Sequence, residues 1–202
     1  MFGNETARRS TVILAVALAA LTVGGTQAMA ASEKTATDTA GRAFGRLGPL
    51  ADLVVERLRV GDRVAASKFG TDKPIDDPAR EEQELAAVRT RAFALGLDPE
   101  RTAAFFSDQI TASKVVQRGL FDRWTAHPEQ APTTRRDLTE IRAELDELTT
   151  SLLTELVATN DVRDHGAPCR VDVLEAQTSA DVVDHLDELH RTALRTALQS
   201  LC

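Results

Sequence analysis

The sequence predicts an all-α protein, a single-domain bundle of about five or six helices. Apolar residues recur at spacings of three and four along several long segments, which is typical of helices with one buried face. No stretch alternates between apolar and polar residues for long, so the pattern of a half-buried strand is missing from the sequence. The pairs Asp77-Pro78 and Asp98-Pro99 each have the form of a helix N-cap followed by proline at the first helical position.

The N-terminal 30 residues have the pattern of a secretory signal peptide. Arg8 and Arg9 precede an apolar run of about 13 residues, which is shorter than the roughly 20 residues of a membrane-spanning helix. Small residues then lead to Ala30, where we expect cleavage. The arginine pair fits twin-arginine export only loosely, so we expect the ordinary secretory route. The sequence therefore predicts a secreted or periplasmic protein with no membrane association after signal removal.

The mature chain begins with residues 31–40, which are small and polar and are expected to be disordered. Residues 41–202 form the predicted helical domain. A first helix is expected from about Ala40 to Phe69, followed by a loop at 70–76. Its predicted inward residues are Phe44, Leu47, Leu50, Val54, Leu58 and Val64.

Three further segments also have the apolar spacing and the capping residues of helices. Asp77 and Asp98 are expected to cap helices that run to about Leu95 and Trp124. Asp137 or Thr134 is expected to cap a strongly amphipathic helix with inward residues Leu138, Ile141, Leu145, Leu148, Leu152, Leu153 and Leu156.

The C-terminal part has weaker signals. Gly166 and Pro168 are interpreted as the end of the preceding region, and 171–177 as a short helix. Ser179 is expected to cap the last helix. Its predicted inward residues are Val182, Leu186, Leu189, Leu194 and Leu198.

Charge and cysteine content narrow the function further. The chain has 24 basic and 31 acidic residues, a net charge of −7, which disfavours nucleic acid as a partner. Its two cysteines, Cys169 and Cys202, belong to a chain sent to an oxidising compartment, so a disulfide between them is predicted. Two unpaired buried thiols are the alternative.

The four histidines are interpreted as solvated surface residues, and no metal site or cofactor is expected. His185 and His190 are five positions apart, which places them about 140° apart around a helix, so they cannot share a metal. His127 and His165 lie in expected loops without acidic or cysteine partners at ligand spacing. The sequence also contains no glycine-rich phosphate loop and no serine-centred nucleophile motif.

Polar residues on otherwise apolar helix faces are the candidates for chemistry. Arg57 and Lys68 are 11 residues apart, so they share one helix face about 16 Å apart along the axis and could hold a dianion. Arg142 lies on the amphipathic helix, and Ser113 with Gln117 forms a polar patch at i and i+4. Each also has a purely structural interpretation as a surface residue, and spacing alone does not decide between the two.

These residues have the spacing of a known family. The series Arg57, Lys68, Asp77 and Arg80 resembles the catalytic stretch of the all-helical chorismate mutases. The helix bearing Arg142 and the pair Ser113 and Gln117 are similar to further segments of that family. The leader, the order of the segments and the two cysteines resemble the secreted gamma subclass. The resemblance covers nearly all of residues 45–202.

The resemblance implies the conversion of chorismate to prephenate, a step of aromatic amino acid biosynthesis in the shikimate pathway, without a cofactor. It implies that Arg57 and Arg142 bind carboxylates, with Arg80 fixing the pyruvyl side. Lys68 and Gln117 would donate to the ether oxygen of the substrate.

The resemblance implies three further roles, and this chain departs from the secreted pattern at three positions. Glu81 and Asp77 would hold the ring hydroxyl, and Ser113 would contact a carboxylate. Secreted members carry threonine and glutamate where this chain has Ser113 and Gln117, and glutamine in place of Glu84. Glu81 matches the cytosolic bacterial enzymes instead. Glu84 is not included in the expected site.

Two alternative functions fit the same helical frame. An isochorismate-pyruvate lyase would use a similar cationic pocket for a pericyclic elimination. A non-catalytic secreted binding module would be expected to have lost part of the cationic set, whereas Arg57, Lys68, Arg80 and Arg142 are all present. A homodimer is a further possibility that the sequence does not decide.

Overall fold

The computed structural model describes residues 43–202, so the predicted signal peptide and residues 31–40 lie outside the described residues. The described part contains seven α-helices, one 3-10 turn and no strand, which confirms the all-α prediction. Six of the helices have ten or more residues, which agrees with the predicted bundle of about five or six helices. The elements are α2 (Gly48–Lys68), α3 (Pro78–Ala94), α4 (Pro99–Ala126), η1 (Pro128–Gln130), α5 (Leu138–Ala158), α6 (Asn160–Arg163), α7 (Gly166–Asp184) and α8 (Glu188–Ala197). Within residues 43–202 no helix is long and apolar enough to span a membrane.

Aspartate side chains fix the starts of the helices that carry the site. Asp77, Asp98 and Asp137 each accept a backbone N–H from the first turn of α3, α4 and α5, at 3.2, 2.8 and 2.6 Å. Each cap satisfies one of the backbone donors that a helix N-terminus leaves unpaired, and a cap of this kind contributes about 1 kcal/mol. Both Asp-Pro predictions are confirmed, and Asp137 rather than Thr134 caps α5.

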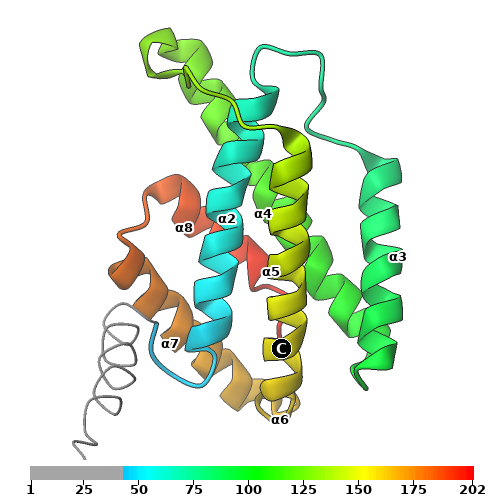
Figure 1. Ribbon diagram of the computed structural model, residues 1–202. Coiled ribbons are helices and arrows are strands. Elements are labelled where there is room, and N and C mark those ends of the chain that lie inside the picture. Colours follow the sequence, from blue (N-terminus) through cyan, green and yellow to red (C-terminus); the bar gives the residue numbers. More distant parts are fainter. Residues whose placement is uncertain (1–42) are drawn as a thin grey trace, which may run out of the picture. The chain divides into compact units, whose positions relative to one another are not determined.

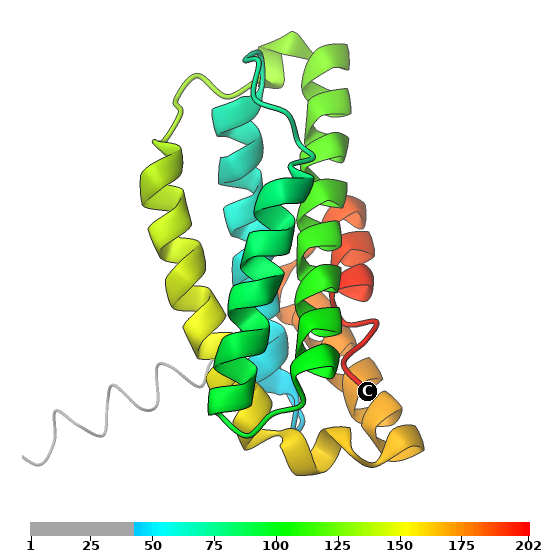
Figure 2. The same cartoon turned by 90° about the vertical axis from the view of Figure 1, so that its right-hand side faces the viewer.

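Helix α2 is the central element of the described part. It contacts α4, α5, α7 and α8, and Figures 1 and 2 show α5 on one side of it and α7 and α8 on the other. The main core lies between these helices, with Leu50, Leu58, Phe105, Leu152 and Leu194 at most 2% exposed. Burying side chains of this size contributes about 1.5 to 3 kcal/mol each.

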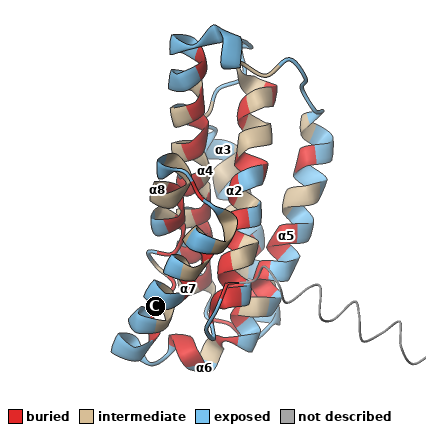
Figure 3. Ribbon diagram, turned by 90° about the vertical axis from the view of Figure 1, so that its left-hand side faces the viewer, coloured by how far each residue is buried: buried red, intermediate tan, exposed pale blue. Residues whose placement is uncertain are grey.

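Helix α3 is much less buried than its neighbours. It packs against α4, and Val88 and Ala92 are its buried residues. Figure 3, in which α3 lies behind the other helices, shows buried red positions along α2 and α4 and exposed pale blue positions on the outer sides of the helices. Because α3 is attached mainly along one side, its other side is free to form the wall of a pocket.

The C-terminal helices differ from the sequence prediction. Gly166 and Pro168 lie in the first turn of α7, which runs through 171–177 and Ser179 to Asp184. The chain reverses at His185, which adopts the left-handed conformation (φ 50°), and Asp187 caps α8. Ser179 therefore caps no helix. Its hydroxyl oxygen instead accepts the backbone N–H of Phe44 at 2.7 Å.

Two predicted inward residues are exposed. Phe44 is 70% exposed because the first described helix begins at Gly48, so this residue precedes the helical register. Val182 is 68% exposed on α7, because the real break at His185 separates it from the face that Leu186, Leu194 and Leu198 bury.

The predicted disulfide is confirmed. Cys169 in α7 is bonded to Cys202 at the C-terminus, with Cα atoms 5.9 Å apart. Cys169 is fully buried. The bond therefore joins α7 to the end of the chain beyond α8.

Candidate active site

A pocket of about 520 Å³ lies between α2, α3, α4 and α5. Residues 73–75 of the loop between α2 and α3 also line it, together with both N-cap residues, Asp77 and Asp137. The pocket contains every substrate-site residue that the sequence predicts: Arg57, Lys68, Asp77, Arg80, Glu81, Ser113, Gln117 and Arg142. Residues up to 85 positions apart in the chain are thus brought to one cavity.

Arg57 is held at the inner part of α2. Its Nη1 donates to the carbonyl oxygen of Leu145 (3.4 Å) and to Oγ1 of Thr149 (3.3 Å), both on α5, and its guanidinium lies 6.0 Å from the centre of the Phe106 ring. Burial lowers the pKa of Arg57 to about 10, although Glu84 and Asp146 oppose this. All of its direct partners are neutral, so its charge is not balanced by a contacting carboxylate.

Lys68 is the last residue of α2, on the same face. Its Nζ donates to the carbonyl oxygen of Ile75 at 3.4 Å, which directs the side chain toward the loop that borders the pocket. Burial lowers the pKa of Lys68 most strongly; Asp77 raises it and Arg142 lowers it further. Arg142 of α5 therefore lies close enough to Lys68 of α2 to lower this pKa, and both side chains line the pocket.

The first turn of α3 forms a capping box. The Asp77 carboxylate accepts the N–H of Arg80, and Oε1 of Glu81 accepts the N–H of Asp77 at 3.2 Å. One turn later, Nη2 of Arg80 is 2.7 Å from Oε1 of Glu84. Asp77 and Glu81 therefore have a structural role at the helix end, whatever they contribute to a ligand.

Helix α4 contributes a polar stripe. Nε2 of Gln117 donates to Oγ of Ser113 at 3.1 Å, while Oε1 of Gln117 is buried and has no hydrogen-bond partner among residues 43–202. Gln117 is 4% exposed. A buried amide with an unused acceptor is costly in a purely structural position, and only a hydrogen-bond donor can complete that oxygen. The second hydrogen of Nε2, beyond the one given to Ser113, is the part of the amide that can bind an acceptor.

Arg142 on α5 is exposed and has no hydrogen bond or ion pair with any described residue. Arg57 and Lys68 likewise have no carboxylate within ion-pair distance in the described part. Arg80, by contrast, is paired with Glu84. Three unpaired cations from two helices therefore surround the pocket, which suits it to an anion with two carboxylates.

Sequence reasoning did not name Lys73, Lys114 and Asp146, which also line the pocket, and it left Glu84 out of the expected site. Ile110, Ser113, Lys114 and Gln117 follow the i, i+3, i+4, i+7 spacing of one helix face, so the position of Lys114 was available from the pattern. The ion pair of Lys114 could not be predicted, because its Nζ contacts Oε2 of Glu81 (2.8 Å), which lies 33 residues earlier in the chain.

The interpretation of all four histidines as solvated is wrong for His190. Its Nδ1 lies 2.6 Å from Oδ1 of Asp187 and its Nε2 lies 2.9 Å from Oδ1 of Asp62. Its side chain is 15% exposed. This ion-pair cluster joins α8 to α2 and lies outside the pocket. No group of three or more His, Cys, Asp or Glu residues within 43–202 is arranged to hold a metal ion.

Comparison with known proteins gives a consistent result. The family model described as chorismate mutase type II matches residues 49–118. The secreted chorismate mutase of Mycolicibacterium smegmatis is 35% identical over 191 residues, covering 95% of this chain and 99% of the relative. That of Mycobacterium tuberculosis is 34% identical over 158 residues, 78% of each chain. The crystal structure of chorismate mutase from Burkholderia phymatum superposes with a TM-score of 0.73 at 36% identity, covering 78% of this chain and 96% of that one.

Proposed function

The chain belongs to the chorismate mutase family, and we propose that it rearranges chorismate to prephenate in the pocket between α2, α3, α4 and α5. The observation that carries this proposal is the presence of three unpaired cations, Arg57, Lys68 and Arg142, around one cavity. Chorismate carries two carboxylates and an ether oxygen. The charge and the size of the pocket fit such a molecule.

The reaction is a one-substrate pericyclic shift. A carbon-oxygen bond breaks while a carbon-carbon bond forms, so neither a nucleophile nor a proton transfer is required. An enzyme accelerates it by holding the enolpyruvyl arm over the ring and by stabilising the negative charge that develops on the ether oxygen. Fixed cations and amide donors supply both effects.

The carboxylates of the substrate are assigned to the arginines. Arg57 and Arg142 each bind one carboxylate, because a guanidinium pairs with a carboxylate through two parallel hydrogen bonds and so fixes its orientation. Arg80 fixes the pyruvyl side, in exchange for part of its pairing with Glu84. Ser113 contacts a carboxylate from α4.

The ether oxygen is assigned to Lys68 and Gln117. Nε2 of Gln117 has a second hydrogen beyond the one it gives to Ser113, and an amide can donate at any pH. The Lys68 ammonium adds a positive charge at the same point. Together they would stabilise the transition state more than the ground state, which is the requirement for a faster reaction.

The ring hydroxyl is assigned to Glu81, with Asp77 beside it. Both carboxylates are held by the capping box at the start of α3, so they are ordered before the substrate arrives. An ordered acceptor loses less conformational entropy on binding.

Turnover of chorismate by the purified chain tests the function, and Lys68→Ala tests the site. We expect the wild type to consume chorismate and form prephenate, and Lys68→Ala to fold normally but lose about 10² to 10³ in kcat. Arg59→Ala removes an exposed cation of α2 that pairs with Asp184, and it serves as the matched control. Near-full activity of Lys68→Ala contradicts the site, whereas an inactive wild type contradicts the function.

Product analysis separates the proposal from its alternatives. The names of the relatives favour a mutase over an isochorismate-pyruvate lyase and over a binding module. Incubation with isochorismate should therefore give no pyruvate above the uncatalysed rate.

We also propose that the chain is exported, because two of its relatives are named secreted chorismate mutases. In a bacterial host the full-length chain should appear outside the cytoplasm with Ala31 as its first residue. N-terminal sequencing checks this, and an uncleaved cytoplasmic protein would contradict it. The homodimer stays a prediction, for light scattering to test.

A further inference from the structure

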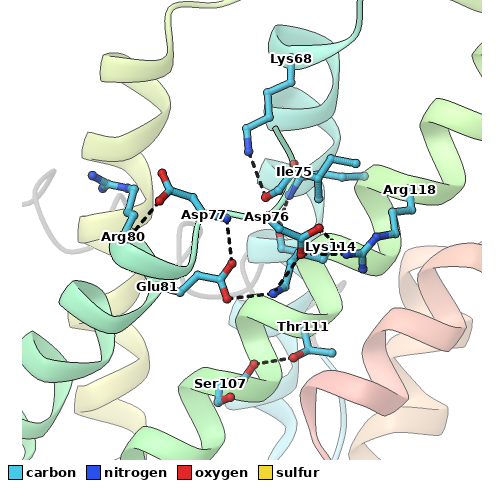
Figure 4. A network of polar contacts seen from close by, with 12 residues as sticks. Lys68, Ile75, Asp76, Asp77, Arg80, Glu81, Ser107, Thr111, Lys114 and Arg118 are labelled. Atoms are coloured by element: carbon cyan, nitrogen blue, oxygen red, sulfur yellow. Dashed lines mark hydrogen bonds and ion pairs between the residues drawn. The ribbon is translucent and has the colours of Figure 1, made fainter. Parts of the chain in front are cut away.

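Lys114 lies on the pocket side of α4 and has no part in the mechanism described so far. Its Nζ is 2.8 Å from Oε2 of Glu81 and 3.4 Å from Oδ1 of Asp76, so it joins α4 to the first turn of α3 and to the loop before it (Figure 4). The side chain is 18% exposed. A cation withdrawn from water in this way is stable only if carboxylates compensate its charge, so the contact constrains both partners.

The Glu81 carboxylate is held from two directions. Oε1 accepts the N–H of Asp77 from its own helix, and Oε2 accepts a hydrogen from Lys114 on α4. Each carboxylate oxygen has about two acceptor positions, so both oxygens retain one for a further donor. Without Lys114 the carboxylate would be held at one oxygen and could turn about its terminal bonds.

The charge of Lys114 matters as well as its position. Glu81 brings a negative charge into a pocket proposed to bind a dianion, and the ammonium offsets that charge at 2.8 Å. The hydrogen bond to Glu81 raises the pKa of Lys114, against the opposing effect of burial. The ammonium therefore stays charged at neutral pH, and Glu81 faces a permanent positive charge.

We propose that Lys114 is a positioning residue of the active site: through its contact with Glu81, it holds that carboxylate in the orientation that accepts the ring hydroxyl of chorismate. The inference rests on the proposed function. Lys114 acts on binding through Glu81 and does not touch the reacting atoms.

The chain supplies a matched control on the same helix. Arg118, one turn beyond Lys114, contacts both carboxylate oxygens of Asp76 at 2.8 and 2.7 Å but does not contact Glu81. Arg118→Met therefore removes a cation from the same network and loosens the same loop while Glu81 keeps its support. Any difference between the two methionine variants reports on Glu81.

Steady-state kinetics with chorismate test the proposal. Because the hydroxyl is bound in both the ground state and the transition state, Lys114→Met should raise KM about 10-fold with a smaller change in kcat. Lys114→Arg should recover most of the affinity, and Arg118→Met should stay close to the wild type. In the background of Glu81→Gln, adding Lys114→Met should produce no further rise in KM, because the residue acts through Glu81.

Two results overturn the proposal. One is an equal effect of Lys114→Met and Arg118→Met, which would make Lys114 a general support of the loop. The other is multiplication of the Lys114→Met and Glu81→Gln effects, which would show that they act independently. If Lys114→Met fails to give a cooperative thermal transition, Lys114→Gln takes its place. A wild type without chorismate turnover refutes the proposed function instead.

Discussion

Among single residues, Gln117 is the one whose chemical type decides how the proposed site responds to pH. Its amide is buried, donates to Ser113 and has a free acceptor. Arg57, Lys68 and Lys114 line the same pocket and surround it with positive charge. A neutral amide donates regardless of pH, whereas a carboxylate in its place donates only when protonated.

We therefore expect turnover of the wild type to stay nearly level from mildly acidic to mildly basic pH. Gln117→Glu should be active in acid and lose activity as its carboxyl ionises, because the ionised group repels the growing charge of the ether oxygen. Gln117→Ala should be slow at every pH. The measurement is kcat against pH for the three proteins. Parallel curves for wild type and Gln117→Glu would show that Gln117 does not face the ether oxygen.

Between elements, His190 forms an ionic link from α8 to α2. The hydrogen bond to Asp62 raises the pKa of His190 to about 9, burial opposes this, and Asp187 adds to it. Burial also opposes ionisation of Asp187, but its bonds to the backbone and ring of His190 outweigh this and lower its pKa to about 2. The cluster is thus an ion pair with two anions across neutral pH.

The ionic link from His190 predicts how the stability of the folded protein changes with pH. A histidine pKa raised above its unfolded value of 6.5 contributes stability that is complete below pH 6.5 and is lost as pH rises through 9. The shift corresponds to about 3 kcal/mol, and exposure of the two carboxylates reduces the expected contribution to about 1 to 2 kcal/mol.

The melting temperature measured at pH 6 and at pH 10 checks this prediction. His190→Asn should lower the melting temperature at pH 6 by several degrees and have little effect at pH 10. His127→Asn alters an exposed histidine near Glu129 and should have little effect at either pH. An equal loss at both values would mean that His190 stabilises the protein by packing and not by its charge.

The same elements show which features of the fold could be predicted from sequence. The starts of α3, α4 and α5 were predictable because an aspartate cap and the first helical turn lie within four residues of each other. The α7–α8 region was misread because its break depends on a left-handed histidine, which has no sequence signature. Gly166 and Pro168 are compatible with a helix start as well as a stop, and only packing decides between them.

The candidate site was likewise predictable from the sequence only in part. Helix geometry predicted that Arg57 and Lys68 share one face of α2, whereas Asp77 and Arg80 were placed in the expected site only by the resemblance to the chorismate mutases. The ion pair between Lys114 and Glu81 could not be predicted, because it depends on how α3 is placed against α4 and on the choice between several carboxylates of α3. The pair of Arg80 with Glu84 joins positions i and i+4 of one helix, so its spacing was visible in the sequence.

Within the described chain, the disulfide that stabilises the fold and the proposed active site lie in different parts of the structure. The pocket is lined by α2 to α5 and the segments between them, whereas the disulfide ties α7 to the C-terminus. The C-terminal segment has further attachments. Nε of Arg163 donates to the carbonyl oxygen of Leu201 at 3.3 Å, and the N–H of Ser200 donates to Asp108 at 2.7 Å. The native position of this segment therefore does not depend on the sulfur bond alone.

The disulfide should accordingly affect the unfolded state more than the active site. Closing a loop of 33 residues reduces the entropy of the unfolded chain by an amount equivalent to about 3.5 to 4 kcal/mol. We expect Cys202→Ser to melt at a clearly lower temperature and to keep nearly full turnover of chorismate at room temperature, because the hydrogen bonds to Leu201 and Ser200 still dock the chain end. Calorimetry and initial rates on the same preparations check the two halves of this prediction, with chemically reduced wild type as the matched comparison. Thiol titration of the exported wild type should find no free thiol. A variant that loses turnover while it is still folded would show that the α7 and C-terminal region acts on the pocket, and the separation argued here would fail.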